Sequence, residues 1–69
     1  MKRKELKELA KKIAKQEKIL QNSEDPKECA AAQDEIMRLS GHVSSLEDMT
    51  ILDEMIQEIL AWLSKNFLI

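Results

Sequence analysis

Cys29 and His42 are the side chains with the widest chemical repertoire, because the chain has one cysteine and one histidine. A cysteine nucleophile needs a base within hydrogen-bond distance, and His42 is the one imidazole available. If one helix separates the two residues, a rise of about 1.5 Å per residue keeps them about 20 Å apart. We therefore expect no catalytic cysteine, no internal disulfide and no four-ligand zinc site.

The acidic side chains do not suggest a metal centre either. Di-iron helical bundles use a Glu-x-x-His pair, whereas Glu35 is followed three residues later by Arg38, which predicts a surface ion pair. Asp53, Glu54 and Glu58 are expected on the solvated side of their helix. The single glycine cannot build a glycine-rich phosphate loop. We expect a protein with no enzymatic activity and no cofactor.

Composition limits the architecture that must position these side chains. The chain has 69 residues, one Gly and one Pro, with 43% hydrophobic and 35% charged residues. These values favour a single helical domain over residues 1–69, because strands would lack turn residues. The sequence contains no apolar run of 18 residues and no signal-peptide pattern, so we expect a cytoplasmic protein without a transmembrane segment. A core this small is marginal unless its helices pack very regularly or a second chain completes it.

The first break between helices is predicted at Asp25-Pro26. Asp25 can cap the following helix, and Pro26 suits its first turn. Glu28 lies three residues after the cap, which is the spacing of a capping box.

The second break is predicted at Gly41. As the only glycine, it can end a helix in the left-handed conformation, and Ser44 with Glu47 predicts a capping box for the next helix. The fold expected is an all-α, small antiparallel three-helix bundle, with helices at about 2–21, 26–40 and 45–67, which dimerisation could complete.

A different interpretation of the second break stays open. A heptad spacing of apolar residues continues through Gly41, so the middle helix could instead run to about residue 48, with Thr50 and Asp53 capping the third. We favour the break at Gly41, because glycine inside a helix costs about 1 kcal/mol relative to alanine.

Charge is divided unevenly along the chain. Residues 1–18 contain eight basic and three acidic residues, whereas residues 19–69 contain three basic and ten acidic ones. On the first helix the lysines predict a basic face opposite the apolar side. This electrostatic face comprises Lys4, Lys7, Lys11, Lys15 and Lys18. This face suggests an alternative function, that of a nucleic-acid-associated accessory protein, although the first helix has no aromatic residues to stack on bases.

The third helix carries more apolar residues than one neighbouring helix can cover. They extend over about half its circumference, wider than the stripe of about 100° that an ordinary surface helix shows. Trp and Met are enriched at protein interfaces. The residues expected to bind a partner are Ile51, Met55, Ile59, Trp62 and Phe67. We therefore expect a protein-interaction module (an adaptor, inhibitor or assembly chaperone) whose partner is another protein or a second copy of the chain.

Residues 2–40 resemble one known layout. A helix, an Asp-Pro turn and a second helix are similar to the helical-hairpin regulators of the sporulation aspartyl-phosphatase family, whose second helix carries Ser-Gln-x-x-Asp. The corresponding stretch here is Ala32-Gln33-Asp34-Glu35-Ile36, which lacks the Ser and has Ile36 in place of the Asp. The resemblance therefore implies the hairpin layout and does not imply phosphatase activity.

Overall fold

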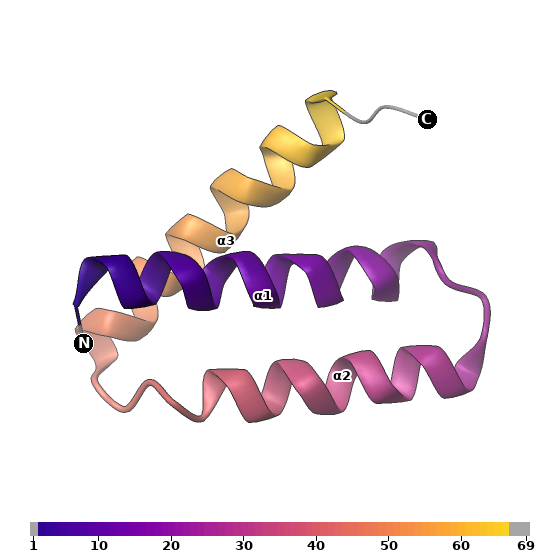
Figure 1. The fold of residues 1–69 in the computed structure, drawn as a ribbon, viewed down its shortest axis with the longest axis horizontal. Coiled ribbons are helices and arrows are strands. Elements are labelled where there is room, and N and C mark those ends of the chain that lie inside the picture. The colour runs from indigo at the N-terminus through magenta and orange to yellow at the C-terminus, as the bar shows by residue number, and fades with distance from the viewer. Residues whose placement is uncertain (1, 67–69) are drawn as a thin grey trace.

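The structure is a computed structural model that describes residues 2–66. It confirms the all-α class and the three-helix bundle. The helices are α1 (Arg3–Asn22), α2 (Pro26–Ser40) and α3 (Leu46–Asn66). α1 and α2 form an antiparallel hairpin, and α3 runs back across α1 at an oblique angle (Figure 1).

The turn between α1 and α2 follows the predicted capping chemistry, with one correction. The backbone N–H of Lys27 donates to Asp25 Oδ1 at 3.0 Å, so Asp25 caps α2 and Pro26 occupies its first turn. The capping box predicts that the backbone N–H of Asp25 donates to the side chain of Glu28. In the structure this N–H donates instead to Ser23 Oγ at 3.2 Å. Ser23 lies two residues before Asp25, so the turn itself supplies this acceptor.

The end of α2 confirms a break at Gly41 and corrects its geometry. Gly41 has φ −65° and ψ −14°, which is right-handed, so the left-handed cap predicted for it is wrong. The N–H groups of His42 and Val43 donate to the carbonyls of Leu39 and Ser40, both at 3.2 Å. These tight bonds satisfy the last carbonyls of α2 without a positive φ.

The start of α3 lies one residue later than the predicted capping box. The backbone N–H of Asp48 donates to Ser45 Oγ at 3.2 Å, so Ser45 is the cap rather than Ser44. The alternative cap at Thr50 is also wrong, because Thr50 lies inside α3 and its hydroxyl donates to the carbonyl of Leu46. α2 therefore does not run to residue 48.

The core lies along α1, which packs against both other helices. Its buried residues come from all three helices and from the second loop: Leu6, Leu9, Ala10, Ile13, Ala14, Leu39, Val43, Leu52 and Ile56. Val43 is only 6% exposed although it lies outside any helix, and it anchors the second loop.

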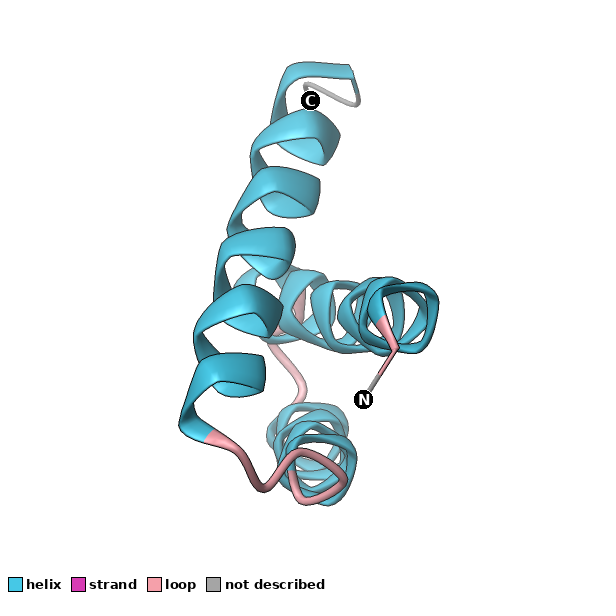
Figure 2. Cartoon of the chain, turned by 90° about the vertical axis from the view of Figure 1, so that its left-hand side faces the viewer, coloured by secondary structure: helices cyan, strands magenta, loops and turns pink. Residues whose placement is uncertain are grey.

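α3 leaves the hairpin as it proceeds. Its first half lies against α1 near the end of α2, and its second half extends past α1 (Figure 2). The buried residues are Leu52 in the first half and Ile56 at the midpoint, whereas the half that extends carries Trp62, which is 56% exposed. The oblique crossing therefore decides which part of α3 is covered.

Candidate functional site

A groove with an apolar floor and a charged rim lies where α3 crosses the start of α1. Its lining residues are Arg3, Lys4, Lys7, Met55, Glu58 and Ile59. Met55 and Ile59 are partly buried and pack against the core. Three cations from α1 therefore border apolar side chains from α3, with one carboxylate beside them.

The two helical periods explain why these residues meet. On α1, Lys7 is four residues after Arg3, and Ala10 follows three residues later on the same side. Ala10 and Ala14 have no exposed surface, so their small side chains allow α3 to pack close to this side of α1. On α3, Ile51, Met55 and Ile59 recur every four residues.

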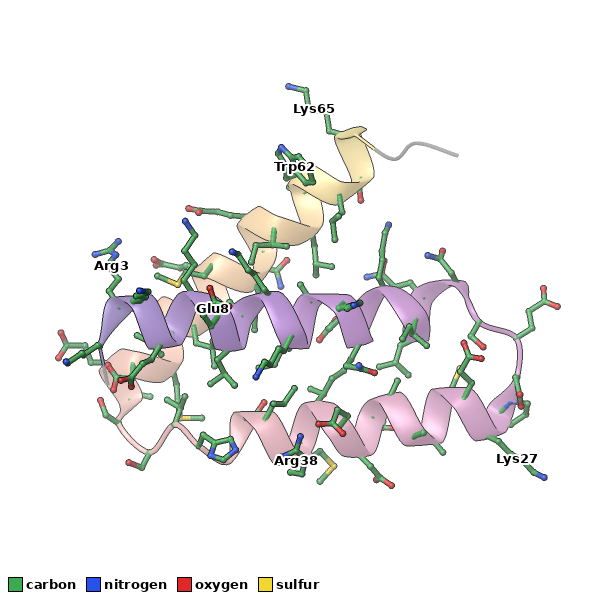
Figure 3. The ribbon with its side chains drawn as sticks, in the orientation of Figure 1. Arg3, Glu8, Lys27, Arg38, Trp62 and Lys65 are labelled. Atoms are coloured by element: carbon green, nitrogen blue, oxygen red, sulfur yellow. The ribbon has the colours of Figure 1, made fainter. Side chains whose placement is uncertain are left out.

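Trp62 continues the floor of the groove beyond the reach of α1. It lies seven residues after Met55 and four after Glu58, so it falls on the same side of α3. Its side chain projects from the extended half of the helix (Figure 3), and it is 56% exposed. We name Ile51, Met55, Ile59 and Trp62 the apolar strip.

Four of the five residues predicted to bind a partner thus lie on this strip. Ile51, Met55 and Ile59 are half-buried against the core, and Trp62 is exposed. Phe67, the fifth, lies outside the described residues. The structure thus divides the predicted set into three residues that support the core and one that faces outward.

The predicted basic face follows the outer side of α1. Lys4, Lys7, Lys11 and Lys15 are exposed and Lys18 is half-buried. Lys11 Nζ lies 3.7 Å from Glu8 Oε1, and both side chains are more than half exposed, so this ion pair adds little stability. Lys4 and Lys7 are the members of the face that also border the groove.

Three other exposed apolar side chains were not selected from the sequence. They are Met37 at 67%, Leu46 at 80% and Met49 at 48% exposure. Leu46 is the first residue of α3, and Met49 lies one turn further on, beside a smaller groove with Ser40 and Asp53. A helix start leaves side chains uncovered on any face that the preceding loop does not reach, and periodicity alone does not show this.

Cys29 and His42 lie at opposite ends of α2 and do not form a site together. The thiol of Cys29 is directed at the backbone carbonyl of Ser23, with Sγ 3.5 Å from its oxygen. His42 lines a separate groove beside Leu9 and Lys12 at the start of α1. Within residues 2–66, the His, Cys, Asp and Glu side chains form no group of three that could hold a metal ion.

No helix among the described residues is both long enough and apolar enough to cross a membrane. Comparison with known proteins found no relative of this chain: no family model, no curated protein and no solved structure matches it.

Proposed function

We propose that this chain is a small, non-enzymatic protein-interaction module that binds its partner through the apolar strip of α3. The observation that carries the proposal is that the exposed Trp62 shares one side of α3 with Met55, which lines the groove. A large aromatic side chain beside a half-covered apolar floor is the typical centre of a protein interface.

The chemistry of the groove indicates which kind of partner would bind there. Burying Trp62 and Met55 removes apolar surface from water, which favours association. Arg3, Lys4 and Lys7 border that surface, and cations at the rim of an interface favour a partner that carries acidic groups. The partner expected is therefore a protein segment with apolar side chains next to carboxylates.

The mode of action proposed is occupancy rather than catalysis. An adaptor, an inhibitor or an assembly chaperone acts by covering a surface of its partner, which needs no nucleophile or metal. We place this role in the cytoplasm, where a single free thiol such as that of Cys29 is kept reduced.

Photo-crosslinking from position 62 tests this function. Trp62 is replaced by the photoreactive aromatic residue p-benzoylphenylalanine and irradiated in the native host, and the same residue at Lys27 is the control. Lys27 is exposed at the far end of the hairpin (Figure 3). A crosslinked polypeptide, of this chain or another, is expected from position 62 and not from position 27. Equal crosslinking from the two positions would refute the proposed function.

Nucleic-acid binding is the second candidate, and the lysine row of α1 is the observation that favours it. Lys4, Lys7, Lys11 and Lys15 are exposed along successive turns, so they could follow a phosphate backbone. The carboxylate of Glu8 beside Lys11 weakens the field of this row. A salt titration distinguishes the two candidates, because binding to phosphates weakens steeply with salt.

A further inference from the structure

We infer that the occupant of the groove is α3 of a second copy of this chain, in a two-fold arrangement with the two α3 helices parallel. This inference rests on the proposed function and names its partner. It starts from charge: α1 has seven basic and three acidic residues, whereas α3 has five acidic and one basic. The two helices that form the groove therefore carry opposite charge.

α3 itself has the chemistry that the groove requires. Glu47, Glu54 and Glu58 are separated by seven and four residues, so they share one side of the helix. Glu47, Glu54 and Glu58 are exposed, and that side borders the apolar strip at Met55 and Trp62. A segment with apolar side chains next to carboxylates is thus present in the chain.

The order of features around α3 sets the orientation. At about 100° per residue, the acidic side comes first, then Met55 and Trp62, and then the side of Leu52 and Ile56 that faces the core. The apolar strip therefore has carboxylates on one side and, toward the core, the cations of α1, which line the groove together with Glu58.

A two-fold axis parallel to α3 places the acidic flank of each copy opposite the basic flank of the other. A two-fold axis perpendicular to α3 makes the helices antiparallel and places like charges together, which is unfavourable. In the parallel arrangement the oppositely charged residues of the two copies also lie at the same position along the helix axis. Arg3, Lys4 and Lys7 line the groove with Met55 and Glu58, so they lie level with Glu54 and Glu58 of the second copy.

Burial favours the same contact. Met55 is half-buried and Trp62 is 56% exposed, and the two recur at a spacing of seven residues. Residues seven apart lie on the same side of a helix, so a second helix laid along this side of α3 would contact both. In the dimer, each copy would cover the exposed Trp62 side chain of the other copy.

Charge exchange between copies tests the inference, with the molar mass measured by sedimentation over a range of concentrations. One variant carries Lys4→Glu and Lys7→Glu, and the other carries Glu54→Lys and Glu58→Lys. Each variant alone is expected to show a dimer dissociation constant raised by roughly tenfold or more, because both symmetric contacts become repulsive. An equimolar mixture is expected to regain the wild-type constant, as is a single chain with all four substitutions.

Matched variants control for general charge effects. At the other end of α1, Lys15→Glu with Lys18→Glu matches the charge change of Lys4→Glu with Lys7→Glu. On the hairpin, Glu24→Lys with Asp34→Lys matches the charge change of Glu54→Lys with Glu58→Lys. Both are expected to keep the wild-type dissociation constant. Circular dichroism melting of every variant identifies any that fails to fold. The chain with all four substitutions restores the attraction between opposite charges, both within one copy and between copies.

Spin labels test the orientation. In a chain with Cys29→Ala and Lys65→Cys, the spin label is attached at position 65. In a parallel dimer the two labels are expected to be separated by one helix-to-helix distance, about 10 Å, plus the length of the label arms. An antiparallel dimer centred on Met55 would separate positions 65 by about 30 Å along the axis. The longer distance would overturn the parallel arrangement.

The failures of the two proposals are distinguishable. A wild-type chain that is monomeric at all concentrations, or a mixture that does not regain the dimer, overturns the second-copy inference. If residue 62 still crosslinks a different polypeptide, the proposed function stands with another partner. A monomer without specific crosslinks from position 62 overturns both.

Discussion

Lys7 of α1 and Met55 of α3 line the same groove, although one was assigned to a basic face and the other to an apolar one. A cation beside a half-buried thioether favours a partner with both an apolar and an acidic group. The groove thus joins a basic face and an apolar side that lie far apart in the sequence.

Replacing Trp62 with Asp is expected to abolish association while leaving the fold intact. Trp62 is 56% exposed, so the new carboxylate stays solvated in the free chain but would be buried without a partner in the complex. A loss of about 2 kcal/mol or more in binding free energy is expected, as for central interface residues. The measurement is the molar mass in solution or the affinity for the captured partner.

Met37→Asp is the matched control for Trp62→Asp. Met37 is a large apolar residue that is 67% exposed on α2 and does not line the groove. Its replacement should not change association. Equal losses from both substitutions would show that any exposed apolar residue matters and that the groove is not specific.

Replacing Asp25 with Ala is expected to lower the free energy of unfolding by about 1 kcal/mol. The substitution removes the acceptor for the N–H of Lys27, which lies 3.0 Å from Asp25 Oδ1. Urea unfolding measures the effect, with Glu24→Ala as the neighbouring control. An unchanged midpoint would rule out the cap at α2.

Replacing Ser45 with Ala should also cost about 1 kcal/mol, whereas Ser44→Ala should cost much less. The two serines are adjacent, but the N–H of Asp48 donates to the hydroxyl of Ser45. Comparing the two unfolding curves therefore locates the first residue of α3. A greater loss from Ser44→Ala would return the cap to the position predicted from the sequence.

Replacing Ala14 with Leu is expected to destabilise the chain by about 1 to 3 kcal/mol, because a larger side chain has no room between packed helices. Ala14 has no exposed surface. Ala31→Leu makes the same change at an exposed position on α2 and should have little effect on thermal melting. If both variants melt like the wild type, the close packing at Ala14 is not present.

Replacing Lys7, Lys11 and Lys15 with Gln should leave the fold intact, since all three side chains are exposed. If the lysine row binds nucleic acid, wild-type affinity should fall steeply between 50 and 200 mM salt and the variant should lose it. Self-association through the groove buries apolar surface as well as rim charges, so it should weaken less steeply over the same salt range than binding to a phosphate backbone. Fluorescence anisotropy with a labelled duplex and with the labelled chain itself separates these results.

Short-range signals in the sequence predicted where the helices begin and end, although not every cap. Asp25 and Pro26 mark the start of α2 because a side-chain acceptor and a fixed φ act within a few residues, and these effects need no tertiary contacts. The lysine face predicted on α1 likewise implied an apolar side opposite it, and that side is buried at Leu6, Ala10 and Ile13, since one helix face must turn toward the core. The cap at Ser45 was missed by one residue because neighbouring serines offer equivalent acceptors.

The way the helices meet depends on long-range packing. Periodicity specifies which side of α3 is apolar but not where along α1 it crosses or at what angle, because both depend on side chains of two helices packing together. That crossing buries Leu52 and Ile56, leaves Trp62 exposed and brings Lys7 beside Met55. The groove exists because α3 leaves the hairpin obliquely, and contacts between residues distant in sequence set that angle.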